Sequence, residues 1–122
     1  MKYTVLYMAP DGSSHFKETE IGFESINFAP PAPPVGLSSF MDTYKLVFFR
    51  IPSGWFGDWH PTPKRQFFFC LSGEIEITVS DEETRSFRSG DVFLLEDTKG
   101  KGHQTKVIGK EDFVAAVVQL QQ

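Results

Sequence analysis

The sequence predicts an all-β fold, and two features of its hydrophobic pattern support this prediction. Short segments rich in β-branched and aromatic residues recur along the chain, and each ends at Gly, Pro, Asp or Ser, as is typical of sandwiches and barrels. No segment places its apolar residues at the 3.6-residue period of an amphipathic helix. We therefore expect one domain of 122 residues whose short strands enclose a single core.

Nine segments have the composition of strands. They span residues 3–8, 15–21, 44–51, 66–71, 74–80, 84–88, 92–96, 102–108 and 113–120. Asp11 and Gly12 form a dipeptide that favours a hairpin turn between the first two strands, and the polar residues 80–83 predict a second turn.

A proline-rich segment separates the N-terminal strands from the rest. Residues 29–34 include four prolines, which cannot donate hydrogen bonds to a sheet and favour extended backbone. We therefore expect a stiff surface connection here. Residues 1–39 would then hold the N-terminal strands and this connection, and residues 40–120 would form the barrel.

The segment 74–79 alternates strictly between polar and apolar residues. Ile75, Ile77 and Val79 share one face of this strand, which predicts a core side and a solvent side.

The segment 66–71 has no such alternation, so both of its faces should be covered. We expect Gln66, Phe68 and Cys70 to face the barrel interior. The opposite face would need a second layer, either the N-terminal strands or another subunit. Residues 45–49 are similarly apolar and would be prone to aggregation as a bare edge. Together the two segments suggest a homodimer.

The overall charge limits the class of partner. The formal net charge is −4, whereas binding to nucleic acid needs a clustered excess of Lys and Arg, so nucleic acid is not an expected partner.

The sequence also bears on where the protein is found. No apolar run approaches the length that spans a membrane, and the first residues do not resemble a signal peptide. The single cysteine, Cys70, suits a reducing compartment. We therefore expect a cytoplasmic protein without a membrane partner.

The most informative spacing lies between Gly54 and Gly73. Five residues separate Gly54 from His60, Thr62 follows after one more residue, Gln66 after another three, and Gly73 after another six. A second cluster begins at Gly90 and continues to His103.

On these residues the chain resembles the small single-domain cupins. Their first motif has a histidine where Thr62 stands and a glutamate where Gln66 stands, and their second motif is matched only loosely around His103. The resemblance implies a cupin, or jelly-roll, barrel in the form of a double-stranded β-helix. The N-terminal strands would pack outside this barrel or in a dimer interface.

The resemblance also implies a metal site. His60 would be the first ligand and His103 the last, with Thr62 and Gln66 at the two intervening positions. A divalent transition metal such as Fe, Ni, Mn, Cu or Zn would then be held by His60, Gln66 and His103. Because Gln66 is neutral where the family has a carboxylate, this site would bind metal less tightly.

Two other arrangements use the same histidines. Asp58 lies two residues before His60 and would share its side of an extended strand, so Asp58, His60 and His103 would form two histidines and a carboxylate, as in non-haem iron oxygenases. Alternatively, one histidine acts without metal as a general base, with Glu96 or Tyr44 as a conceivable acid.

Other residues around His60 suggest a ligand pocket. Trp59 offers an aromatic surface, and Arg65 could meet a carboxylate or phosphate on a ligand. The residues expected to line the pocket are Asp58, Trp59, Thr62, Arg65 and Phe68.

Three functions remain open at this level. The chain could be a metal-dependent enzyme of the oxygenase or isomerase type that uses His60 and His103. It could be a metal-free ligand-binding or sensor protein, or a structural protein that assembles through its Phe-rich faces. Two of the three imply a small-molecule ligand.

Overall fold

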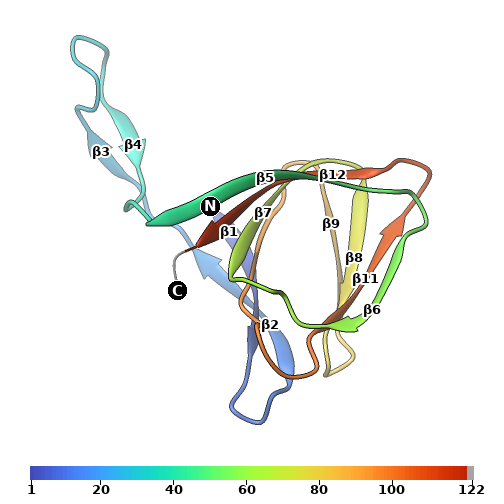
Figure 1. The fold of residues 1–122 in the computed structure, drawn as a ribbon. Helices are drawn as coiled ribbons and strands as arrows, with labels where there is room; N and C mark the ends of the chain where they lie inside the picture. Colours follow the sequence, from blue (N-terminus) through green and yellow to red (C-terminus); the bar gives the residue numbers. More distant parts are fainter. Residues whose placement is uncertain (121–122) are drawn as a thin grey trace.

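The chain folds entirely into strands and turns (Figure 1), in a computed structural model that describes residues 1–120. The strands are β1 (Lys2–Met8), β2 (Ser14–Glu20), β3 (Glu24–Ile26), β4 (Val35–Leu37), β5 (Thr43–Ile51), β6 (Phe56–His60), β7 (Gln66–Ser72), β8 (Glu74–Thr78), β9 (Thr84–Arg88), β10 (Val92–Leu95), β11 (His103–Ile108) and β12 (Phe113–Leu120). Within these residues no helix is present that could cross a membrane.

Two sheets face each other and enclose the core. The larger sheet has the strand order β2-β1-β10-β7-β12-β5, and the smaller one has the order β6-β11-β8-β9. The core between them includes Ile75 and Ile77 from one sheet and Phe68 and Phe93 from the other. This arrangement confirms the predicted all-β fold of the jelly-roll type. The alternation that predicted a core side for β8 is also confirmed.

Burial also controls the chemistry of Cys70 in β7, which packs in the same core. Removal from water, with the nearby Asp91 carboxylate, raises the pKa of its thiol to about 12. Cys70 is therefore a neutral core side chain at physiological pH rather than a reactive nucleophile.

The nine predicted strands are all present, with ends shifted by no more than two residues. Three short strands were not predicted, namely β3, β4 and β6. The strand β6 contains Gly57 and Asp58, which have low strand propensity, and it forms because β11 supplies its hydrogen-bonding partner.

The proline-rich segment lies on the surface as expected, but its backbone is not extended. Residues 29–34 form the turn of a hairpin in which β3 pairs with β4. The amide of Ala32 donates to the carbonyl of Ala29 at 2.9 Å within this turn. The prolines fit because turn positions need no ladder hydrogen bond.

The N-terminal strands extend the larger sheet. The strand β1 pairs in parallel with β10 and antiparallel with β2. Tyr3 of β1 contacts Phe67 of β7 edge to face, with ring centroids 5.3 Å apart, in a second apolar cluster on the outside of this sheet. The N-terminal strands therefore extend the sheet of β7 rather than form the expected second layer over it. Phe67 is buried beside Tyr3, whereas Phe69 and Leu71 of the same strand remain exposed.

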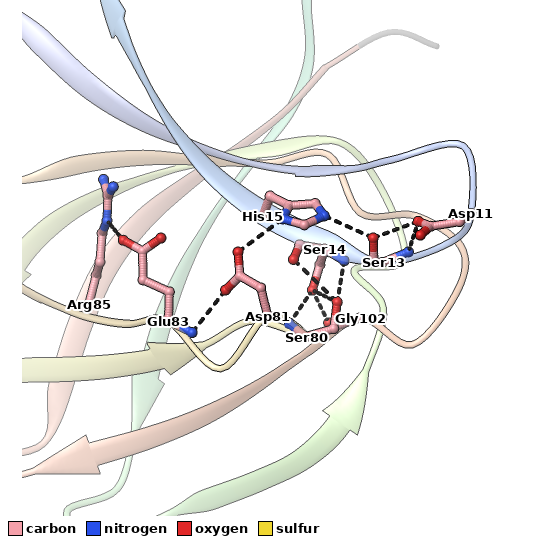
Figure 2. A network of polar contacts seen from close by, with 9 residues as sticks. All are labelled: Asp11, Ser13, Ser14, His15, Ser80, Asp81, Glu83, Arg85 and Gly102. Atoms are coloured by element: carbon pink, nitrogen blue, oxygen red, sulfur yellow. Dashed lines mark hydrogen bonds and ion pairs between the residues drawn. The ribbon is translucent and has the colours of Figure 1, made fainter.

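Polar contacts fix the N-terminal hairpin to the turn between β8 and β9 (Figure 2). The buried hydroxyl of Ser14 donates to the carbonyl of Gly102 at 2.7 Å and accepts from the amide of Ser80 at 2.9 Å. His15 Nδ1 pairs with the carboxylate of Asp81 at 2.9 Å. The contact from Ser14 reaches the residue that precedes His103, so the hairpin supports the start of β11.

Candidate functional site

Two histidines lie side by side at the edge of the smaller sheet. His60 ends β6 and His103 begins β11, and the two residues are paired across these strands. Their ring centroids are 4.7 Å apart. The pairing therefore joins the two motif histidines, which are 43 residues apart in the chain numbering.

Gly102 allows this close approach. It has a φ of +78°, and a Cβ at this position would fall on the backbone carbonyl of His60. Only glycine can adopt this positive φ and approach the His60 carbonyl so closely without strain. The backbone of β11 can therefore start directly against His60.

The ring of His103 is anchored by a buried carboxylate. Its Nδ1 lies 2.6 Å from Oδ2 of Asp97, and both side chains are buried. The backbone carbonyl of Asp97 accepts from the amide of Thr62 at 3.1 Å, which holds this loop against the segment after β6. The other carboxylate oxygen, Oδ1 of Asp97, is buried without a partner in the described chain.

His60 is anchored in a similar way by a backbone group. Its Nδ1 donates to the carbonyl oxygen of Asp58 at 2.6 Å, since a carbonyl can only accept. In each ring Nδ1 is thus engaged by the protein. Nε2 is left as the nitrogen that can meet a ligand.

Both rings line a cavity of about 200 Å³ between the two sheets. Its walls are mainly apolar and come from strands of both sheets. The lining residues are Phe49, Ile51, Trp55, His60, Thr62, Pro63, Gln66, Phe68, Ile75, Ile77, Phe93, Leu95, His103 and Thr105.

The cavity lining also includes a chain of neutral polar groups. The Thr62 hydroxyl donates to the carbonyl of Lys64 at 2.8 Å and accepts from Nε2 of Gln66 at 3.1 Å. Because the hydroxyl proton is used, the Gln66 amide must present its nitrogen to Thr62. Its oxygen then accepts from Nε2 of Gln119 at 3.3 Å. Thr62 and Gln66 therefore satisfy each other within the protein.

The predicted pocket residues divide into two groups. Thr62 and Phe68 line the cavity, whereas Asp58, Trp59 and Arg65 are not among its lining residues. Arg65 forms an ion pair with Glu96 at 2.7 Å, and the Trp59 ring lies 4.0 Å from Nζ of Lys101.

The carboxylate of Asp58 is exposed and directed toward other partners. It accepts from the side chain of Gln104 and from the backbone amide of Trp59, both at 2.9 Å. These two hydrogen bonds lower the pKa of Asp58 below its ordinary value. Only its backbone carbonyl contacts His60.

Asp97 is the main residue that the sequence reasoning missed. The two conceivable partners named for the histidines lie elsewhere, because Glu96 pairs with Arg65 and Tyr44 is exposed on β5. Asp97 is the neighbour of Glu96 and lies six residues before His103. Nothing in this spacing distinguishes it from the surrounding loop residues.

A metal would need more donors than the two imidazoles. Within residues 1–120, no group of three or more His, Cys, Asp or Glu side chains is arranged to hold a metal ion. The Gln66 oxygen, which the sequence suggested as a third donor, already accepts a hydrogen bond from Gln119.

The sequence profile of the cupin domain family matches residues 47–119, which is more than half of the chain. The chain belongs to the cupin family. The match includes His60, Gln66 and His103 and also Asp97. No curated protein matches the chain in sequence.

Solved structures share the fold of this cupin. The Cnp3 cupin domain of Schizosaccharomyces pombe has a TM-score of 0.55 at 18% identity, over 99% of this chain and 88% of that one. The DMSP lyase DddQ of Ruegeria pomeroyi has a TM-score of 0.53 at 18% identity, over 83% of this chain and 48% of that one. A cupin 2 conserved barrel domain protein of Salinispora arenicola has a TM-score of 0.52 at 20% identity, over 81% of this chain and 74% of that one. At these identities the likeness concerns the fold alone.

Proposed function

We propose that this cupin binds a small, largely apolar carbonyl compound in its cavity and transfers a proton on it without a metal. His103 is the base in this proposal, Asp97 holds it in place, and His60 is the second proton carrier. The reaction class is that of an isomerase that works through an enol or enolate.

The observation that carries the proposal is the buried pair of Asp97 and His103, whose 2.6 Å contact lies beside an apolar cavity. A carboxylate on Nδ1 of a histidine fixes the tautomer and stabilises the imidazolium that forms when Nε2 takes a proton. An unpartnered oxygen on a buried carboxylate is costly and needs an explanation. We explain the burial of Asp97 by its role in holding the His103 imidazole in place for proton transfer.

The donor set argues against a resident metal. Transition-metal sites in proteins use three or more strong donors, usually imidazole, carboxylate or thiolate groups, whereas the cavity offers two imidazoles and the neutral side chains of Thr62 and Gln66. Thr62 and Gln66 are already joined by a hydrogen bond, and neither carries charge. The nearby carboxylates of Asp58 and Asp97 face Gln104 and His103 Nδ1 instead.

The cavity also restricts the ligand. Its volume of about 200 Å³ is below the roughly 300–1,000 Å³ of sites for drug-sized ligands, so a small molecule is expected. Phe49, Phe68 and Phe93 would surround an apolar body. The two imidazoles would meet one polar end, for which a carbonyl group is suited because it can accept a hydrogen bond.

The proposed step balances within these groups. Nε2 of neutral His103 removes a proton from the carbon next to the carbonyl, and the electron pair of the broken C–H bond forms an enolate. The protonated form of His60 donates from Nε2 to the enolate oxygen or to a neighbouring carbon. The neutral and protonated histidines exchange roles in the reverse direction.

The proposal can be tested by isotope exchange. Chain purified with EDTA is screened by thermal shift against small β-diketones, 2-oxo acids and cyclic ketones, and the compounds that bind are incubated in D₂O and followed by NMR. We expect EDTA-resistant exchange that falls on the order of 100-fold or more in His103→Gln. His15→Gln removes a histidine outside the cavity and should leave the rate unchanged. Exchange that survives His103→Gln, or that requires added metal, contradicts the proposal.

A further inference from the structure

The cavity opens between the free edges of the two sheets. The strands β5 and β6 end the larger and the smaller sheet, and within the described chain each pairs on one side only. Trp55 and Pro63, which precede and follow β6, are the exposed residues of the cavity lining, whereas most of the other lining residues are buried. A ligand would therefore reach His60 and His103 past Trp55 and Pro63.

A turn fixes the backbone of Trp55 at this mouth. The amide of Trp55 donates to the carbonyl of Pro52 at 3.0 Å, which closes the turn over residues 52–55. Gly54, the third residue of this turn, has a φ of +80°, which favours glycine. The Trp55 carbonyl accepts from the amide of Val107 in β11 at 2.9 Å. The backbone of Trp55 is therefore held against the smaller sheet, and only its side chain is free to rotate.

The indole of Trp55 lies on Gly57 beside the ring of His60. A Cβ at Gly57 would collide with Cη2 and Cζ3 of Trp55, and it would lie 3.1 Å from Cε1 of His60. The six-membered ring of the indole and the edge of the imidazole therefore meet over the same glycine. Gly57 is buried beneath them, whereas Trp55 is 40% exposed. The indole thus covers the part of the mouth next to His60.

Trp55 differs from the other aromatic side chains of the cavity wall in its contacts. Phe68 contacts Phe49 edge to face with ring centroids 5.4 Å apart, and it stacks on Phe93 with centroids 4.7 Å apart. These three rings therefore fix one another. In the part of the chain that the structure describes, the Trp55 ring has no such stacked or edge-to-face partner. Its surface is therefore available to a ligand.

The size of the cavity limits a ligand to about one ring. The cavity volume is about 200 Å³, and an apolar cavity of about 150 Å³ in another protein accepts benzene. A second fused ring would need the space that the indole occupies. Among the described residues that line the cavity there is no Lys or Arg, so a carboxylate on the ligand would lack a guanidinium or ammonium partner. These features favour a neutral compound.

We propose that Trp55 selects the ligand, because its indole closes the mouth over a neutral ketone with a single ring and excludes larger ones. The carbonyl oxygen would lie at His60 and His103, and the ring would lie between the indole and the phenylalanines of the cavity wall. Gly57 takes part in the selection, since any side chain at this position would push the indole aside. The selection rests on the proposed function in requiring a ligand in the cavity, but it does not require proton transfer.

Binding of two saturated ketones to the full chain tests the selection. Cyclohexanone has one ring, whereas 2-decalone has two fused rings and is the more apolar compound. By isothermal titration calorimetry we expect wild type to bind cyclohexanone about tenfold or more tightly than 2-decalone, a preference that hydrophobicity alone would reverse. Trp55→Ala deletes the indole and Gly57→Ala displaces it, so each variant should lose this preference.

The chain offers a matched control at Phe56. This exposed aromatic residue lies between Trp55 and Gly57 in the sequence and does not line the cavity, so Phe56→Ala should keep the preference of wild type. The φ of Gly57 lies outside the left-handed region, and an added Cβ would meet the end of a side chain. Gly57→Ala should therefore fold, as far-UV circular dichroism can confirm.

Fluorescence locates the bound ketone. In a Trp59→Phe background Trp55 is the remaining tryptophan, and its emission should shift to shorter wavelength when cyclohexanone covers the indole. Ketone binding with a preference that depends on Trp55, but without isotope exchange, would contradict the proposed reaction and support the selection. Equal binding of both ketones to wild type, binding of neither, or an unchanged preference in both Trp55→Ala and Gly57→Ala would overturn the selection.

Discussion

The polar residues of the cavity form two sets that differ in how their hydrogen bonds are satisfied. We call His60 and His103 the histidine side, and Thr62 and Gln66 the amide side. On the histidine side, His60 and His103 use Nδ1 for contacts within the protein and keep Nε2 for the cavity. On the amide side, Thr62 and Gln66 bond to each other and then to Lys64 and Gln119. The histidine side therefore directs two Nε2 atoms toward a ligand, whereas the hydrogen bonds of Thr62 and Gln66 are made within the protein.

This difference explains what the altered cupin motif does. Thr62 and Gln66 occupy two of the positions that the resemblance assigned to metal ligands, yet they form part of a hydrogen-bonded wall. The two histidines at the remaining positions are paired across β6 and β11, and His103 contacts the carboxylate of Asp97. The chemistry is therefore expected on the histidine side, and the amide side is expected to contribute mainly stability.

Gly102→Ala would disrupt the histidine side most strongly. The added Cβ would meet the His60 carbonyl in a backbone conformation that favours glycine, so we expect a loss of about 3 kcal/mol in the free energy of unfolding. Urea denaturation measures this loss. Gly109 has a similar φ of +82° but open space around it, so Gly109→Ala should cost only about 1 kcal/mol. Equal losses in the two variants would show that contact with His60 is unimportant.

Thr62→His/Gln66→Glu would convert the amide side into a metal-binding side. It restores the residues of the family motif beside His60 and His103, and adds an imidazole and a negative charge. We expect Zn²⁺ or Ni²⁺ to bind roughly 100-fold more tightly than to wild type, as measured by isothermal titration calorimetry. Gln66→Glu alone should give a smaller gain. An unchanged affinity in the double variant would mean that more than these two side chains separates this cavity from a metal site.

Thr62→Val tests whether the amide side contributes stability. The methyl group replaces the hydroxyl and leaves Nε2 of buried Gln66 without its acceptor, so we expect a loss of about 2 kcal/mol in unfolding free energy. Thr62→Ser retains the hydroxyl and should lose less than about 1 kcal/mol. If valine and serine behave alike in urea denaturation, the hydrogen-bonded chain adds nothing to stability.

The smallest effect concerns the Asp58 carboxylate, which we place outside the histidine side. Its pKa is lowered mainly by the Gln104 side chain and then by the Trp59 amide. A lowered pKa stabilises the fold at pH values above the unfolded pKa of about 3.9, and this stability is lost as the pH falls through the folded value. Gln104→Leu should raise the pKa of Asp58 toward its ordinary value, as measured by carboxyl NMR titration. A His103 resonance that follows the Asp58 titration would place this carboxylate in the site after all.

Much of the fold could be predicted because its strands carry strong local signals. The alternation in residues 74–79 and the apolar run in residues 66–71 identified β8 and β7, and the motif spacing indicated the cupin fold. The strand β6 could not be predicted locally, because Gly57 and Asp58 oppose it and β11 stabilises it. The hairpin of β3 and β4 was missed because prolines indicate only that a ladder cannot pass through them.

The site was harder to predict than the fold. The spacing of the two motifs brought His60 and His103 to attention, and their pairing follows from the sheet register. The role of Asp97 depends on the path of the loop between β10 and β11, which places its side chain beside His103 rather than in solvent. The path of a loop leaves no periodic pattern in the sequence from which it could be predicted. The partners of Arg65 and Asp58 likewise depend on contacts between distant segments.

The metal content of the tag-free chain, purified without added metal or chelator, tests the central claim most directly. If His60 and His103 act by proton transfer without a metal, elemental analysis should find no more than traces of Fe, Ni, Mn, Cu or Zn. His60→Ala should then have the same content as wild type. About one equivalent of a transition metal in wild type, lost in His60→Ala, would contradict the account.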